Sequence, residues 1–275
     1  MRNTIQCGSY ILDFKKTVLM GIINVTPDSF YHATRTQSIE EAVAYAQKMI
    51  QEGADIIDVG AESTRPGSDP ISVDEELSRI IPVVKRLVEE CSVPISVDTY
   101  KPKVAESCLK VGAHIINDIT GLTNSDMRKV VAQYDVPVVL MHMQGTPKNM
   151  QQNPVYTDVV AEIKLFFMKQ IEKAQSSGIQ KIILDPGIGF GKTVTHNLNI
   201  LKRLQEFQDL GFPILVGPSR KSFIGTITGL PVEQRLEGTI AAVVIACMHG
   251  AHIVRVHDIA ACKHAVQIVD ALRGV

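Results

Sequence analysis

Eight short apolar runs recur along the 275-residue chain, and most of them precede a segment with helical periodicity. They begin near residues 18, 55, 94, 114, 138, 181, 213 and 252, with D-I-I-D-V-G and K-I-I-L-D as examples. The apolar residues are continuous, which is typical of parallel strands buried on both faces, whereas half-exposed strands alternate. Eight strand–helix units in one chain predict an α/β fold, a TIM (β/α)8 barrel.

A doubly wound sheet is the alternative fold, but it usually carries a Gly-rich turn directly after its first strand. Here the first run ends N-V-T-P-D. The N-terminal segment T-I-Q-C-G-S-Y-I-L-D-F alternates about a glycine, which predicts a β-hairpin that closes the bottom of the barrel. Because no linker or low-complexity run divides the sequence, we expect a single domain over residues 1–275.

Composition limits the partners and the compartment. Twenty-eight Lys and Arg against 29 Asp and Glu give a net charge of −1, so we expect no general affinity for nucleic acid or for a membrane surface. The five cysteines show no C-x-x-C spacing, and no apolar stretch is long enough to span a bilayer. These features predict a cytoplasmic protein with free thiols.

The segment G-F-G-K-T at 189–193 resembles the end of a nucleotide-binding P-loop. The P-loop pattern requires a glycine five residues before its second glycine, and that position holds Pro186. Proline has no N–H to offer a phosphate, and its ring fixes φ near −65°. We therefore expect this loop to bind something other than a nucleotide.

Polar residues close most of the apolar runs, and TIM barrels place their active sites at the C-terminal strand ends. The candidates at these ends are Asn24, Asp58, Glu62, Asp98, Asn117, Asp118, His142, Asp185, Ser219, Arg220, Lys221, Arg255 and His257. For Glu62, Asp118 and His142 a purely structural role, such as capping a helix or bonding a neighbouring loop, is an open alternative.

The types of these residues indicate a ligand with two different ends. Asp and Asn side chains can bond the donor-rich edge of a flat heterocycle, while Lys221 meets a carbonyl or ring nitrogen. Arg255 and His257 can hold an anion. The histidines are scattered, with no H-x-H after the first strand, so we expect no zinc site built by the protein.

Seven segments in this order resemble dihydropteroate synthase, and the resemblance extends from about residue 4 to 272. They are M-G-I-I-N-V-T-P-D-S-F (20–30), E-S-T-R-P-G (62–67), S-V-D-T-Y-K (96–101), N-D-I-T-G (117–121), L-D-P-G-I-G-F-G-K (184–192), S-R-K-S-F-I-G (219–225) and R-V-H-D (255–258). The resemblance implies a transferase of folate biosynthesis, the sulfonamide target, that joins 6-hydroxymethyl-7,8-dihydropterin diphosphate to p-aminobenzoate and releases pyrophosphate. It also implies a TIM barrel, commonly a homodimer, and reaction through a pterin cation.

The same resemblance assigns roles to individual residues. It implies a pterin pocket formed by Asp98, Asn117, Met141, Asp185, Phe190, Gly217 and Lys221. It implies contacts to p-aminobenzoate or the phosphates from Phe30, Thr64, Arg65, Pro66, Ser222, Arg255 and His257. The catalytic residues would be Asp98, Lys221, Arg255 and His257, with Mg²⁺ held by Asn24 and by phosphate oxygens.

One stretch departs from the family. After T-P-D-S-F the family usually continues S-D-G-G, whereas this chain has Y-H-A-T at 31–34, so His32 replaces an acidic loop residue. A binding-only relative with an impaired first loop therefore stays an alternative. So does a methyltetrahydrofolate-dependent methyltransferase, which has no diphosphate to expel, although S-R-K-S-F and R-V-H-D argue against it.

We expect replacement of His32 by Asp to raise kcat a few-fold at saturating p-aminobenzoate. A carboxylate can stabilise a pterin cation, whereas a histidine, if protonated, opposes it. Steady-state kinetics of His32→Asp checks this, and an unchanged kcat would mean that product release limits the rate. A fall of about tenfold with pterin affinity intact would show that His32 has its own role in loop closure or catalysis.

Overall fold

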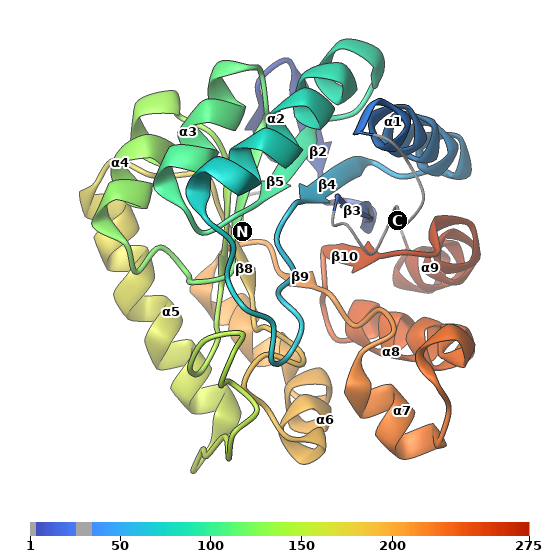
Figure 1. The fold of residues 1–275 in the computed structure, drawn as a ribbon. Helices are drawn as coiled ribbons and strands as arrows, with labels where there is room; N and C mark the ends of the chain where they lie inside the picture. Colours follow the sequence, from blue (N-terminus) through green and yellow to red (C-terminus); the bar gives the residue numbers. More distant parts are fainter. Residues whose placement is uncertain (1–3, 26–34, 275) are drawn as a thin grey trace.

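The computed structural model describes residues 4–25 and 35–274. Eight parallel strands form one sheet in the order β8-β7-β6-β5-β4-β3-β10-β9 (Figure 1). The strands are β3 (Val18–Asn24), β4 (Ile56–Gly60), β5 (Ile95–Asp98), β6 (Ile115–Asp118), β7 (Val138–Met141), β8 (Ile182–Asp185), β9 (Leu215–Val216) and β10 (Ile253–Val256). A parallel bridge between Leu184 and Ile214 joins the two edges, so the sheet is a nearly closed barrel, as the sequence predicted.

Helices surround the barrel (Figure 1). They are α1 (Arg35–Glu52), α2 (Val73–Glu90), α3 (Pro102–Lys110), α4 (Ser125–Tyr134), α5 (Val159–Ser176), α6 (Val194–Lys202), α7 (Ser222–Thr228), α8 (Leu236–Met248) and α9 (Ile259–Arg273), with 3-10 turns η2 (Leu204–Leu210) and η3 (Val232–Gln234). Local sequence sets several starts: Ser72 caps α2 by accepting from the Glu75 N–H, and Asp158 caps α5. In the described part of the chain no helix is long and apolar enough to cross a bilayer.

The strands divide their side chains between two cores. Residues that point outward pack against the helices in the larger core. Inward residues near the start of the strands, including Met20, Ile56 and Ile183, form a second core with the N-terminal hairpin. That hairpin consists of β1 (Thr4–Cys7) and β2 (Tyr10–Asp13), and it contributes buried Ile5, Leu12 and Phe14, among others. The hairpin therefore closes the bottom of the barrel, as predicted.

Strand alternation carries polar side chains to the other end of the barrel interior. Asp58 lies two residues after Ile56 in β4, and Asp185 lies two residues after Ile183 in β8. Asn117 in β6 and Arg255 in β10 stand in the same relation to Ile115 and Ile253. Because alternate residues share a face of a strand, all four point into the barrel above its apolar layer.

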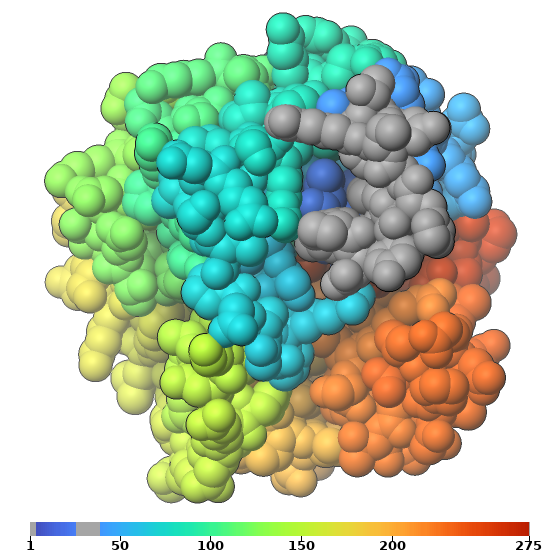
Figure 2. All heavy atoms as spheres, viewed as in Figure 1, coloured from blue at the N-terminus to red at the C-terminus, as the bar shows by residue number. Residues whose placement is uncertain are grey.

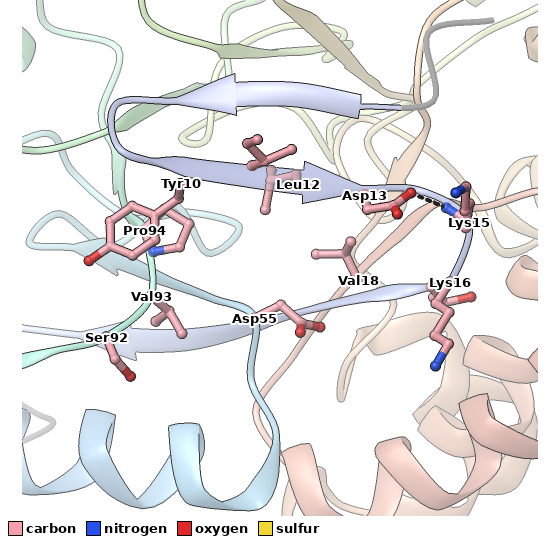
Figure 3. Close-up of a pocket in the computed structure, with 12 residues that line it drawn as sticks. Tyr10, Leu12, Asp13, Lys15, Lys16, Val18, Asp55, Ser92, Val93 and Pro94 are labelled. Carbon is pink, nitrogen blue, oxygen red and sulfur yellow. Dashed lines mark hydrogen bonds between the residues drawn. The ribbon is translucent and has the colours of Figure 1, made fainter.

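A cavity of about 440 Å³ lies at the barrel bottom, between the hairpin and the start of β3 (Figure 3). Its walls include Tyr10, Leu12 and Val18, with Asp55 and Lys16 at its polar side. The residues that the sequence predicted as functional are not among those that line it. The predicted functional residues lie instead at the opposite, C-terminal end of the strands.

Candidate active site

Arg255 is the centre of the polar layer. Its Nε donates to Asp58 Oδ2 at 2.6 Å, and an Nη donates to Asp98 Oδ2 at 2.7 Å. Asn117 Nδ2 donates to the same Asp58 oxygen at 3.1 Å. Burial raises the pKa of Asp98 to about 7 although Arg255 acts in the opposite direction. Four strands thus bring two acids, an amide and a guanidinium together inside the mouth.

Asp185 and Lys221 form a second part of the site. Asp185 ends β8, and its carboxylate accepts a bond from the Gly187 N–H at 2.8 Å. Lys221 precedes α7, and its Nζ lies 3.9 Å from the centroid of the Phe190 ring. Burial lowers the pKa of Lys221 to about 8, against the attraction of Asp185, and burial raises that of Asp185. A cation and an aromatic face thus lie beside a buried acid.

His257 is oriented by Ser219. The Ser219 Oγ lies 2.9 Å from His257 Nδ1, and the backbone N–H of His257 donates to the same hydroxyl at 3.3 Å. Burial, and then Arg255, lower the pKa of His257 to about 4, so its ring is neutral at pH 7. In the tautomer in which the Ser219 hydroxyl donates to Nδ1, the ring proton lies on Nε2. His257 can therefore donate one hydrogen bond to an anion.

Arg220 and Asp258 join the two motifs that carry these groups. The guanidinium of Arg220 makes two hydrogen bonds to the Asp258 carboxylate, at 3.0 and 2.9 Å. Arg220 has a φ of +54°, an uncommon value for a residue with a side chain. This bidentate pair ties the segment before α7 to the end of β10, which places Lys221 and His257 in one mouth.

The loop after β8 uses its glycines for packing. Gly187 and Gly191 have φ of +68° and +62°. A Cβ at these positions would lie 2.0 Å from the His142 carbonyl oxygen and 2.4 Å from the Gln144 carbonyl oxygen. The resemblance to a P-loop therefore reflects close contact between two barrel loops.

Lys192, in the position of the P-loop lysine, is buried under this loop. Its Nζ donates to the carbonyl oxygens of Phe190 (2.8 Å) and His142 (3.2 Å), and lies 3.1 Å from His142 Nδ1. Burial lowers the pKa of Lys192 to about 7 and that of His142 to about 3. His142 and Lys192 thus hold the loops after β7 and β8 together. This contact agrees with the structural role that the sequence left open for His142.

The other two residues with a structural alternative, Asp118 and Glu62, also make structural contacts. Asp118 accepts from the Thr120 N–H (2.8 Å), the Thr120 hydroxyl (2.6 Å) and the Leu122 N–H (2.9 Å), so it stabilises the turn after β6. Glu62 accepts from the Tyr100 hydroxyl at 2.7 Å and forms a buried ion pair with Lys101. Both carboxylates therefore have structural partners.

The loop after β4 carries Thr64, Arg65 and Pro66. Within this loop, Ser68 Oγ donates to Arg65 O at 2.8 Å. The loop is joined to the segment after β7 by a bond from the Gly67 N–H to Pro147 O at 2.9 Å. In Figure 2 the loop after β4 lies across the face of the molecule, next to the segment after β7. Arg65 and Pro66 are exposed.

The remaining predicted residues fall into three groups. Met141 is buried at the end of β7, and Gly217 follows β9 with Arg255 Cβ 3.7 Å from the place of a Cβ. Ser222 is exposed at the start of α7. Phe30 and His32 lie outside the described residues. Asp58 and Lys192 are buried, but neither was among the residues predicted to bind substrate. Strand alternation from Ile56 indicates the inward position of Asp58.

Asn24 ends β3 on the same strand face as Met20, beside Gly60 of β4. Within residues 4–25 and 35–274 no group of three or more His, Cys, Asp or Glu side chains is arranged to hold a metal ion. An amide oxygen is nevertheless a ligand that Mg²⁺ accepts, provided that most of its other ligands come from waters or phosphate oxygens. The residues present thus fit a cation that arrives with a phosphorylated substrate.

Comparison with known proteins agrees with this geometry. The family described as pterin binding enzyme matches residues 20–257. Dihydropteroate synthase of Escherichia coli (strain K12) is 50% identical over 262 residues, which cover 94% of this chain and 93% of that protein. The dihydropteroate synthase of Bacillus subtilis (strain 168) is 45% identical over 261 residues, which cover 94% of this chain and 89% of that protein.

Solved structures give the same result. Yersinia pestis dihydropteroate synthase, in a complex with a sulfonamide drug, superposes with a TM-score of 0.94 at 43% sequence identity. The superposition covers 99% of this chain and 100% of the Yersinia pestis chain. The Xanthomonas albilineans enzyme with 4-aminobenzoic acid superposes at 0.93, with 42% identity and full coverage of both chains.

Fold and site together define a pterin-binding enzyme built on a TIM barrel. The chain belongs to the dihydropteroate synthase family. It joins 6-hydroxymethyl-7,8-dihydropterin diphosphate to p-aminobenzoate, forming 7,8-dihydropteroate and pyrophosphate, as the sequence motifs predicted.

The packing role of the loop glycines can be tested by stability. We expect Gly187→Ala to lower the free energy of unfolding by roughly 2–4 kcal/mol, because backbone strain and a clash add together. Gly178 is the matched control: its φ is +89°, but nothing lies within 4 Å of the place of a Cβ. Gly178→Ala should cost roughly 1 kcal/mol in urea unfolding. Equal losses in the two variants would contradict the packing role.

Proposed function

We propose that residues 1–275 work as one domain in which the pterin ring binds inside the mouth, between Asp185 and Lys221. The Asp185 carboxylate would accept hydrogen bonds from the N–H edge of the ring, and Lys221 would donate to its carbonyl or ring nitrogen. Asp98 and Asn117 would bond the other edge of the ring, while Met141, Phe190 and Gly217 line its faces. The observation that carries this proposal is a buried acid at the end of β8 and a cation just before α7, beside an aromatic face.

The diphosphate is proposed to bind at the side of the mouth formed by Arg255 and His257. Arg255 offers a permanent positive charge, and neutral His257 offers one N–H from Nε2. Asn24 lies at the end of a neighbouring strand and would hold Mg²⁺ together with phosphate oxygens. When bound, the ion would neutralise charge on the leaving diphosphate.

The proposed chemistry is a dissociative substitution. The bond between the pterin CH2 and the diphosphate oxygen breaks, and pyrophosphate leaves with the electron pair. The positive charge that remains is delocalised into the ring, where the Asp98 carboxylate favours it when ionised. The amine of p-aminobenzoate then attacks the CH2 and loses a proton. Fixed charges of this kind contribute on the order of 10²- to 10³-fold each.

The second substrate is proposed to bind at the outer part of the mouth. Thr64, Arg65 and Pro66 after β4, Ser222 at the start of α7, and Phe30 would form its pocket. The exposure of Arg65 and Pro66 supports a pocket that is completed when the loops close over bound pterin. In the solved relative from Xanthomonas albilineans, 4-aminobenzoic acid is bound.

Asp185→Asn and Lys221→Ala should each lower kcat/KM for pterin diphosphate by at least about 10²-fold, because each leaves a buried group without its charged partner. Steady-state kinetics, with melting curves as the folding control, provide the measurement. Turnover near that of the unmodified enzyme in either variant would rule out this pterin pocket.

We also propose a cytoplasmic homodimer. The five cysteines are unpaired and buried, which suits a reducing compartment. Helix α8 is apolar on its outer side as well, where Ile245 and Met248 are 44% and 53% exposed. On the adjacent helix α9, Ile268 and Leu272 are 66% and 73% exposed. Exposed apolar side chains on adjacent helices support a self-association surface.

Met248→Glu should convert the dimer to a monomer at micromolar concentration, because it places a charge on the proposed contact surface. Ile11→Glu is the control, since Ile11 is 64% exposed but lies on the hairpin at the barrel bottom. Light scattering should give a halved mass for the first variant and an unchanged mass for the second. A monomeric unmodified enzyme, or a dimer that tolerates Met248→Glu, would refute the surface.

A further inference from the structure

Asp58 lies deeper in the barrel than the residues that face the ligand. Its side chain has no exposed surface, whereas those of Asp98 and Arg255 are 10% and 18% exposed. One of its oxygens, Oδ2, accepts from both Arg255 and Asn117, while Oδ1 has no hydrogen-bond partner. A ligand in the mouth cannot reach this carboxylate without displacing Arg255 or Asn117.

The contact between Asp58 and Asn117 fixes the orientation of an amide. Asp58 Oδ2 accepts hydrogen bonds from Arg255 and from Asn117, so the Asn117 NH2 group is turned toward Asp58. One N–H and the carbonyl oxygen of Asn117 are then left for a ligand. Without Asp58 the amide could turn over and present a different pattern of donors and acceptors.

The contact with Arg255 has a separate consequence. In the structure Arg255 is shared between Asp58 and Asp98. If pterin is to bond Asp98, Arg255 must retain another buried counter-charge, because an unpaired charge in this position is costly. Asp58 supplies it, so Asp98 can be used by the ligand while Arg255 stays in place.

We propose that Asp58 is a positioning residue for pterin diphosphate, which sets the Asn117 amide and holds Arg255 while Asp98 binds the ring. The proposal rests on the roles given above to Asn117, Asp98 and Arg255. It assigns to Asp58 no contact with substrate. Its effects should therefore appear in pterin binding and depend on the residues through which it acts.

The test combines substrate binding with a double-mutant cycle. Pterin diphosphate is titrated calorimetrically without p-aminobenzoate, and KM for p-aminobenzoate is measured separately. We expect Asp58→Ala to raise the dissociation constant by about 10²-fold and Asp58→Asn by about tenfold, with KM for p-aminobenzoate changed less than about threefold. In an Asn117→Ala background Asp58→Ala should lose clearly less than in the unmodified enzyme, since coupled residues are not additive.

Ser96 provides a matched control. It is the neighbour of Asp58 in the sheet register, it is fully buried, and its hydroxyl has no hydrogen-bond partner. Ser96→Ala should leave pterin binding within about twofold. A similar loss in Ser96→Ala would mean that the interior responds to any change, and this would overturn the specific role of Asp58.

The outcomes separate the inference from the function on which it rests. Normal binding in Asp58→Ala, or losses that add fully with those of Asn117→Ala, would overturn the inference while the pterin site stands. Normal binding in Asn117→Ala would instead refute the proposed site. If Asp58→Ala does not fold, Asp58→Asn is the deciding variant, because it keeps the shape of the side chain and one acceptor oxygen. A dissociation constant of Asp58→Asn for pterin diphosphate within about twofold of that of the unmodified enzyme then overturns the inference.

Discussion

The ion pairs of Arg255 inside the barrel are the interaction on which the site depends. Burial by itself lowers the pKa of Arg255, but Asp58 and Asp98 more than offset this effect, and the guanidinium remains charged. Removing one partner from a buried pair of this kind typically costs about 3–5 kcal/mol. A different register between β10 and β3 would move Arg255 along the barrel relative to Asp58 and Asp98 and leave these charges unpaired. The polar layer thus also favours the observed register of these strands.

Around this centre the site combines rigid and less constrained parts. Asp98, Asn117 and Asp185 lie on strands, and the Arg220–Asp258 pair fixes the segments that carry Lys221 and His257. The loop after β8 is held by Lys192 and by glycines that pack against the loop after β7. The loop after β4 is exposed over Arg65–Gly67 and is anchored mainly at its base, by Glu62 and Lys101. This division suits a reaction in which a prebound ring waits for a second substrate and loop closure.

Much of the fold and of the polar layer at the barrel mouth could be predicted from the sequence, because buried parallel strands appear as continuous apolar runs and polar residues close these runs. The contacts of Asp58 could not be predicted in full, since they depend on the pairing of β10 with β3, which brings together positions 197 residues apart. The burial of Lys192 could not be predicted from the sequence either. A lysine after glycines suggests phosphate binding, and only the packing of two loops shows that this lysine is buried. The strand at 215–216 proved shorter than its apolar run indicated: the Ile214 N–H donates to the His252 ring at Nδ1 and not to a neighbouring strand.

The reaction assigned to this barrel mouth expels pyrophosphate from a pterin diphosphate and transfers the pterin to an aromatic amine. The most direct measurement is pyrophosphate release by the purified protein, with pterin diphosphate and Mg²⁺, in the presence and absence of p-aminobenzoate. We predict sustained release that requires p-aminobenzoate and equals the amount of dihydropteroate formed. Tight binding of pterin diphosphate without p-aminobenzoate-dependent release would contradict the account and identify a binding-only relative.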